Sequence, residues 1–271
     1  METSVKIYAR IGELMQGTLS DGRAFMVSGI SSTRWYSEAW LDEEGGGEPL
    51  PPKACRALSL LLGKTDRSLN GTRVCLHSNI PRGKGLSSSS TDVLSVLSLV
   101  NGYLGMGLSP EELYCLAARV EPSDPCLSDD ILLFYQQAGI VGRRIGLPAM
   151  TLLYSDAGPG RVVDTESVCR PWTPGLGRYY DWLLRSFLRA AEAGDHEALF
   201  DCITASAEYN QTVVPLPRWE EWLRLATESR AGLMVAHSGT FAGLLVPPER
   251  AGGLRARLEV LSGAPVFVEQ P

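Results

Sequence analysis

The segment 79–92 places a run of glycine and serine between a predicted strand and a strongly apolar predicted helix, and it constrains this chain more than any other feature. Val74 and Leu76 alternate with polar residues, which predicts a strand over 73–78. The apolar stretch 93–100 predicts a helix behind the loop. Glycine lets the backbone approach a ligand closely, and the first N–H groups of a helix have no intrahelical partner. The order strand, loop and helix therefore favours a phosphate site at the helix start.

Lys84 adds a positive charge to this loop, and the serines that follow add hydroxyl groups that can contact phosphate oxygens or ligate magnesium. A Gly/Ser-rich surface loop without a ligand is the alternative interpretation. The run is not the P-loop pattern G-x-x-x-x-G-K-[ST]. It is not a Rossmann fingerprint either, because no third glycine stands three residues after Gly83 and Gly85. The pattern therefore predicts a phosphate site of another kind.

The composition of the whole chain narrows the class of partner. The net charge is −6 and no stretch is rich in lysine or arginine, so we expect no nucleic-acid partner, because such binding needs clustered cations. No apolar run reaches the roughly 20 residues that span a bilayer, so we expect no membrane partner. The six cysteines include no C-x-x-C pair, which disfavours a zinc site. Without a recognisable targeting signal, the default expectation is a cytoplasmic protein with reduced thiols.

The remaining pattern predicts two domains, for which 271 residues suffice. Pro148 marks the expected boundary, giving an N-terminal domain over 1–147 and a C-terminal domain over 148–271. The first domain is expected to contain strands at 5–9, 25–30, 35–41, 73–78, 131–135 and 139–145, a turn at Gly12, and helices at 53–62, 93–100 and 110–120. Beyond the boundary we expect the ferredoxin-like order strand, helices, strand, strand, helix, strand at 150–154, 179–193, 196–210, 218–229, 233–236, 241–246, 249–261 and 265–268.

The sequence PRGKGLSSSS at 81–90 resembles the ATP-binding motif P-x-x-x-G-L-x-S-S-[SA] of the GHMP kinases, a superfamily that includes galactokinase, homoserine kinase, mevalonate kinase and phosphomevalonate kinase. Within that superfamily, further segments resemble the L-threonine kinases of cobalamin synthesis and follow in the same order along nearly the whole chain. These segments are 12–17, Asp92, 121–124, 163–165, 210–211 and 236–240.

The resemblance implies an α+β fold of two domains. Its N-terminal domain would be like domain 2 of ribosomal protein S5, its C-terminal domain would be ferredoxin-like, and the active site would lie between them. It implies ATP and Mg²⁺ as cofactors. The nucleotide would be bound by Pro81, Gly83, Lys84, Gly85, Leu86, Ser87, Ser88, Ser89 and Ser90.

The resemblance also assigns roles to charged residues after the next helix. Glu121 and Ser89 would ligate magnesium, with Ser90 as the alternative serine, while Asp124 and Lys84 would be catalytic. An exposed charge at a helix end is the other interpretation of Glu121, and a turn residue beside a proline is that of Asp124. Asp129 and Asp130 are competing candidates for the general base. The acceptor would be bound by Gly12, Glu13, Gln16, Asp124, His237, Ser238, Gly239 and Thr240.

The function predicted from this resemblance is transfer of a phosphoryl group from ATP to the hydroxyl of a small amino acid, with L-threonine as the first candidate. Three departures from the family pattern concern the acceptor: Ser123 in place of Thr, Pro125 in place of Gly, and the absence of a Cys-Pro pair at 28–30. They keep open serine, homoserine or a modified β-hydroxy amino acid of specialised metabolism. A non-catalytic nucleotide-binding regulator is the alternative of another class. A monomer or a homodimer is expected.

Overall fold

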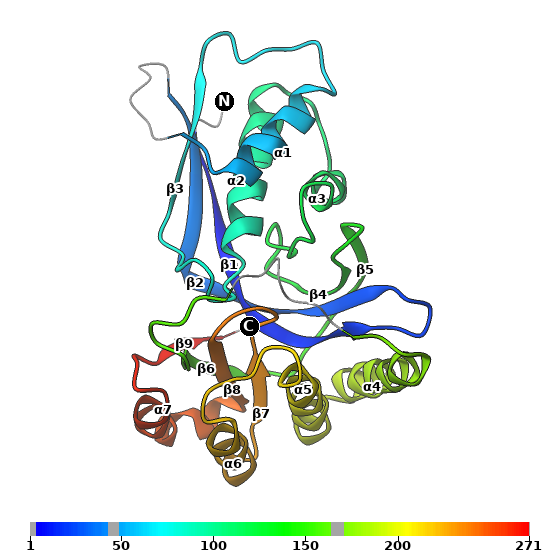
Figure 1. Ribbon diagram of the computed structural model, residues 1–271, viewed down its shortest axis with the longest axis vertical. Helices are drawn as coiled ribbons and strands as arrows, with labels where there is room; N and C mark the ends of the chain where they lie inside the picture. Colours follow the sequence, from blue (N-terminus) through cyan, green and yellow to red (C-terminus); the bar gives the residue numbers. More distant parts are fainter. Residues whose placement is uncertain (1–3, 43–48, 164–170, 271) are drawn as a thin grey trace.

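The computed structural model describes residues 4–42, 49–163 and 171–270 (Figure 1). Within these ranges nine strands form one sheet in the order β5-β4-β2-β1-β7-β8-β6-β9, with β3 paired to β2, and the pairings are antiparallel. The elements, in chain order, are β1 (Ser4–Thr18), β2 (Ala24–Asp42), α1 (Pro52–Leu62), β3 (Arg73–Ser78), α2 (Ser88–Tyr103), α3 (Pro110–Ala118), β4 (Ile131–Tyr135), β5 (Ile140–Ile145), β6 (Thr151–Asp156), α4 (Pro174–Ala193), α5 (His196–Asn210), α6 (Trp219–Ser229), β7 (Gly232–Val235), β8 (Phe241–Val246), a 3₁₀ helix (Pro248–Gly253), α7 (Arg255–Ser262) and β9 (Phe267–Glu269).

The long hairpin of β1 and β2 runs through the middle of the molecule. The prediction of two strands over 25–30 and 35–41 is wrong, because β2 continues through both. One part of β2 pairs with β3 and another with β4. The predicted turn at Gly12 is also wrong: Gly12 lies inside β1 with φ +57°, near a register shift in its pairing with β2. Glycine accommodates this left-handed dihedral without ending the strand, and the pairing stays regular from Ile11 with Ile30 to Glu13 with Ser28.

The helices form layers against the sheet (Figure 1). In the upper part of the figure, α2 packs between α1 and strands β1 and β2. The sequence of α2 is apolar nearly all round, as expected of a helix that is buried on most sides. In the lower part, α4 and α5 pack on β1, and α5 also packs on β7. The α6 side chain Trp222 is fully buried in a core shared with α7 and β6 to β8, so this tryptophan is a core residue.

The C-terminal strands have the predicted ferredoxin-like order, with β6 between β8 and β9 and with β7 outside β8. The helix predicted over 249–261 is interrupted, because a 3₁₀ helix ending at Gly253 precedes α7. Two adjacent glycines disfavour a continuous α-helix at that point. Strand pairing between Glu13 of β1 and Val235 of β7 connects the two parts of the sheet. The domain boundary near Pro148 falls between β5 and β6 and stays a prediction. No helix in the described part of the chain is long and apolar enough to cross a membrane.

Candidate active site

The loop between β3 and α2 has the backbone conformation that its glycines suggest. Gly83 and Gly85 have φ values of +67° and +78°, and Ser87, immediately before α2, has φ +55°. The Ser87 side chain does not cap the helix, and its hydroxyl donates a hydrogen bond to the Arg10 carbonyl at 3.3 Å. Since the first N–H groups of a helix have no intrahelical acceptor, the start of α2 can donate to an anion.

This glycine loop packs backbone to backbone against the loop between β7 and β8. A Cβ atom on Gly239 would overlap the Lys84 carbonyl, and one on Gly85 would overlap Ala236. The Lys84 carbonyl oxygen accepts hydrogen bonds from the N–H groups of Thr240 at 3.1 Å and Phe241 at 3.3 Å. The fold thus brings together the two loops that the sequence assigned to nucleotide and acceptor.

Lys84 is held by an aspartate that sequence reasoning missed. Its Nζ atom lies 2.6 Å from Oδ2 of Asp156 and donates to the Gly158 carbonyl at 3.1 Å. The side chains of Lys84 and Asp156 are only 12% and 18% exposed. Asp156 Oδ1 also accepts from the Thr240 hydroxyl at 2.6 Å and from the Gly158 N–H at 3.0 Å. Asp156 ends β6, so it links the glycine loop to the C-terminal strands.

The serines at the start of α2 contact two different carboxylates. The Ser89 hydroxyl donates to Glu121 Oε1, and Lys53 Nζ lies 2.5 Å from Glu121 Oε2. The Ser90 hydroxyl contacts Asp124 instead: it accepts from the Asp124 N–H at 3.0 Å and donates to Asp124 Oδ2 at 3.4 Å. Carboxylate and hydroxyl oxygens are ligands that Mg²⁺ prefers. Of the two candidate serines, Ser89 is the one that contacts Glu121, so the Ser89–Glu121 pair is the candidate magnesium position.

The surroundings of Asp124 favour the protonated form of its carboxyl group. Burial is the main cause that raises its pKa, and the negative charge of Glu121 acts in the same direction. Hydrogen bonds from Ser87 and Ser90 and the positive charge of Arg10 oppose the shift without cancelling it. A carboxylate whose pKa is raised is a stronger base than an exposed aspartate, as proton abstraction requires.

Arg10 fixes the loop that follows Asp124, and sequence reasoning missed it as well. Its side chain is buried, at 2% exposure, and its guanidinium donates to main-chain carbonyls. The acceptors are Gly29 at 3.0 Å, Asp129 at 3.3 Å, Pro125 at 3.4 Å, Asp130 at 2.8 Å and Ser128. Burial lowers the pKa of Arg10, although interactions with nearby ionisable groups, which include Asp129 and Asp124, oppose that shift. One side chain thus joins β1 and β2 to the whole segment 125–130.

The competing carboxylates have other partners. Asp129 Oδ1 accepts from the Ser31 hydroxyl at 2.7 Å. Asp130 Oδ2 lies 2.9 Å from Arg144 and accepts from the Ser128 hydroxyl at 2.8 Å. Neither has a hydrogen bond to the serines of α2 among those that the structure describes. The geometry therefore favours Asp124 over both as the carboxylate beside the helix start.

The residues expected to bind the acceptor lie on β1 and on the loop after β7. Glu13 and Gln16 are buried, and Gly12 approaches the Met234 side chain closely. His237 and Ser238 are half-buried, whereas Gly239 and Thr240 are buried. The pairing of Glu13 with Val235 places these two groups next to each other. Asn210, from another family-like segment, donates to the Ala236 carbonyl at 3.1 Å and supports the same loop.

Asp92 and Val163, from two other family-like segments, contact the glycine loop. Asp92 is buried. Its carboxylate lies 2.9 Å from the Arg82 guanidinium and accepts a hydrogen bond from the Ser37 hydroxyl at 2.6 Å, so it connects the glycine loop to β2. The Val163 N–H donates to the Gly83 carbonyl at 3.1 Å. The remainder of that motif, Asp164 and Thr165, lies outside the described residues.

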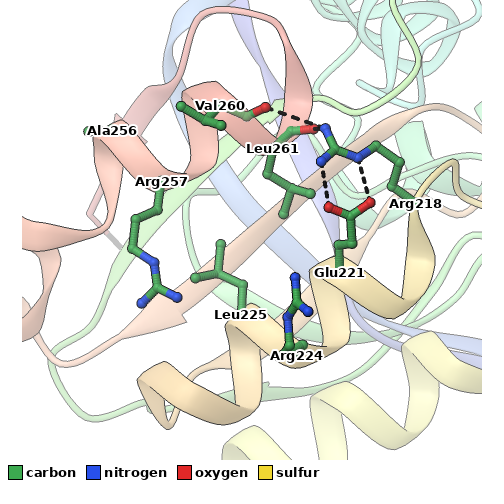
Figure 2. A pocket seen from close by; sticks show the side chains of 8 residues that line it. All are labelled: Arg218, Glu221, Arg224, Leu225, Ala256, Arg257, Val260 and Leu261. Carbon is green, nitrogen blue, oxygen red and sulfur yellow. Dashed lines mark hydrogen bonds and ion pairs between the residues drawn. The ribbon is translucent and has the colours of Figure 1, made fainter.

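A surface groove of about 400 Å³ lies elsewhere, between α6 and α7 (Figure 2). Its arginines are paired with glutamates: Arg218 Nε donates to Glu221 at 2.7 Å, and Arg257 contacts Glu228. It contains none of the predicted site residues. The groove therefore adds nothing to the cluster around α2.

Comparisons with known proteins show which proteins this chain resembles. Residues 52–136 match the family described as GHMP kinases N terminal domain. An L-threonine kinase of Citrobacter freundii is 29% identical over 260 residues, covering 89% of this chain and 85% of that protein. An L-threonine kinase of Salmonella typhimurium is 27% identical over 197 residues, covering 67% of this chain and 62% of that protein.

A solved structure shows the same fold over the full length. Streptococcus pneumoniae phosphomevalonate kinase in complex with phosphomevalonate and AMPPNP superposes with a TM-score of 0.77, at 14% identity and 100% coverage of both chains. The resemblance indicated by the motifs is confirmed, and the α+β fold of this chain is that of the GHMP kinases.

Proposed function

We propose that this chain, which has the GHMP kinase fold, is an ATP-dependent phosphotransferase whose acceptor is the side-chain hydroxyl of a small amino acid, best matched by L-threonine. The match to the GHMP kinase family supports the phosphotransferase assignment. The two L-threonine kinases that resemble the chain support the acceptor. O-phospho-L-threonine would be the product, and cobalamin synthesis in the cytoplasm is the proposed setting.

The arrangement at the start of α2 is the single observation that carries the proposal. Ser87 has a left-handed backbone conformation, and its side chain does not cap the helix start. The Ser89 hydroxyl donates a hydrogen bond to Glu121, and the Ser90 hydroxyl donates one to Asp124. Phosphoryl transfer needs positioned phosphate donors, a metal position and an acceptor-side carboxylate, and little covalent chemistry from the protein. This arrangement places candidates for all three on one helix turn and the segment 121–124.

Each residue then has a distinct task. The N–H groups of the first turn of α2 would bind the triphosphate, and Lys84, whose ammonium group lies 2.6 Å from Asp156, would add positive charge from within the glycine loop. Ser89 and Glu121 would hold Mg²⁺, which when bound neutralises charge that develops on the phosphate oxygens. Asp124 would accept the proton of the acceptor hydroxyl while the hydroxyl oxygen forms its bond to the γ-phosphorus and ADP departs.

On the acceptor side, Glu13 is the candidate partner for the ammonium group of the amino acid. Backbone N–H groups of the loop 236–240 or the side chain of His237 would meet its carboxylate. The Thr240 hydroxyl donates to Asp156, so Thr240 is more suited to supporting the loop than to binding the substrate. Such a site recognises an amino acid head and a β-hydroxyl at the same time.

A panel assay of acceptors tests the proposal. We expect phosphorylation of L-threonine, a kcat/KM for L-serine lower by roughly 10- to 200-fold because one methyl contact is lost, and no phosphorylation of L-valine. ADP release and mass spectrometry of the products measure the outcome. Galactose and mevalonate serve as acceptors without an amino-acid head. Turnover confined to those two compounds would overturn the hydroxy amino acid assignment, and no turnover with any acceptor despite AMPPNP binding would favour the non-catalytic regulator.

The pH dependence of kcat tests the role of Asp124. Because burial raises its pKa, the acid limb should lie at higher pH than the ordinary range of aspartate, with activity lost as the pH falls through that limb. Ser90→Ala removes a hydrogen bond that lowers this pKa, so the limb should move to still higher pH. Ser59→Ala, an exposed change on α1, is the matched control and should leave the limb in place. A limb that Ser90→Ala does not move would contradict the assignment.

A further inference from the structure

Lys53 lies in the first turn of α1, and its position there is electrostatically unfavourable with respect to the helix itself. The start of a helix carries partial positive charge, which favours acidic side chains, and α1 has none in its first turn. No side chain caps α1 either. The contribution of Lys53 must therefore come from its contacts outside the helix.

Lys53 contacts Glu121, the proposed magnesium ligand. Lys53 Nζ lies 2.5 Å from Oε2 of Glu121, while the Ser89 hydroxyl contacts Oε1. Both oxygens of the carboxylate are thus engaged within the protein. The two charged side chains are 33% and 14% exposed, so solvent and salt screen their attraction less than that of a surface pair.

Besides Glu121 and the Ser89 hydroxyl, the described residues offer a divalent cation few ligands at this position. A magnesium or manganese ion requires about six oxygen ligands. The residues that the structure describes contain no group of three or more His, Cys, Asp or Glu side chains able to hold a metal. A single carboxylate already neutralised by an ammonium group is a poor site for a free ion.

We propose that Lys53 is a built-in counter-cation of the metal position. It neutralises Glu121 in the nucleotide-free protein and keeps divalent cations from binding until a triphosphate supplies additional oxygens and negative charge. The metal therefore enters with the nucleotide rather than before it. The identity of that nucleotide rests on the proposed function, whereas the effect of Lys53 on the carboxylate does not.

Direct titration with Mn²⁺ without nucleotide, followed by electron paramagnetic resonance of the free ion, tests this proposal. Lys53→Met removes the charge while keeping much of the side-chain length, and it should tighten Mn²⁺ binding by roughly fivefold or more, since that factor corresponds to the loss of about 1 kcal/mol of ion-pair attraction. Lys53→Arg keeps the charge and should bind Mn²⁺ like the unaltered protein. Lys64→Met removes an equal charge just beyond the other end of α1 and should also leave the affinity unchanged.

The gain in Mn²⁺ affinity of Lys53→Met must depend on Glu121. Adding Glu121→Gln to the Lys53→Met variant should abolish it, and circular dichroism would confirm that every variant is folded. Unchanged or weaker Mn²⁺ binding by Lys53→Met would overturn the proposal, as would an equal gain in Lys64→Met. Binding of AMPPNP to the unaltered protein is measured separately by calorimetry. Its failure would refute the proposed function while leaving the Mn²⁺ comparison interpretable.

Discussion

Asp124→Asn will lower kcat by roughly two to four orders of magnitude while leaving nucleotide affinity nearly unchanged. Asparagine has almost the same shape, so the contacts that the side chain and the main-chain N–H of residue 124 make with the Ser90 hydroxyl can persist. It cannot accept the proton of the acceptor hydroxyl. Because burial and Glu121 raise the pKa of the native carboxyl group, the protein loses an unusually basic aspartate with this single change. Steady-state kinetics with L-threonine and calorimetry with AMPPNP measure the two effects.

The neighbouring aspartates provide the controls. Asp129→Asn and Asp130→Asn alter carboxylates that are bound to Ser31 and to Arg144, so each should retain most of its turnover. Near-normal kcat in Asp124→Asn would show that the base is elsewhere, or that a phosphate oxygen of the substrate takes the proton. A large fall in Asp129→Asn or Asp130→Asn alone would identify the residue to examine next.

The second large effect concerns stability. Arg10→Met should lower the free energy of unfolding by about 3 kcal/mol or more, because several buried and partly buried carbonyl groups lose their donor together. These carbonyls belong to Gly29 and to the segment 125–130. Arg10→Lys should recover only part of the loss, since an ammonium group cannot reproduce the planar fork of the guanidinium. Urea unfolding followed by tryptophan fluorescence measures both variants.

Arg23→Met is the matched control for Arg10. Arg23 is exposed and pairs with Asp21 at 2.6 Å across the turn of the same hairpin. Its replacement should change the free energy of unfolding by no more than about 0.5 kcal/mol. Equal effects of the two substitutions would mean that the buried hydrogen bonds of Arg10 contribute no more than a surface ion pair.

Local sequence patterns predicted the parts of the site that are local in sequence. The glycine loop, the serines and the helix behind them lie within one short segment, so their spacing alone predicts a phosphate site. The partners of these residues come from distant segments. Asp156 reaches Lys84 from the end of β6, and Lys53 reaches Glu121 from α1. No periodicity or motif relates such pairs, because only the packing of the sheet and helices sets their distance.

The errors in the predicted elements have the same origin. Residues 31–34, between the two predicted strands, are all polar, which is typical of a loop. In the fold, the Ser32 and Thr33 hydroxyls donate to the buried Glu269 carboxylate at 3.0 and 2.7 Å. Hydrogen bonds to β9 therefore stabilise this polar part of β2. The turn predicted at Gly12 is wrong because glycine is typical of turns, whereas Gly12 lies inside β1, and only the pairing of that strand with β2 shows that the chain does not reverse there.

The pairing of β1 with β7 has a consequence for the folding pathway. The N-terminal hairpin can form early from neighbouring residues, but the second edge of β1 finds its partner only when Val235 becomes available. Contacts of such long sequence separation cost loop-closure entropy and slow folding. Until then, a growing chain presents an unpaired strand edge to its surroundings, a surface to which other extended segments can add. We therefore expect that completion of the sheet and assembly of the proposed acceptor side occur together, late in folding.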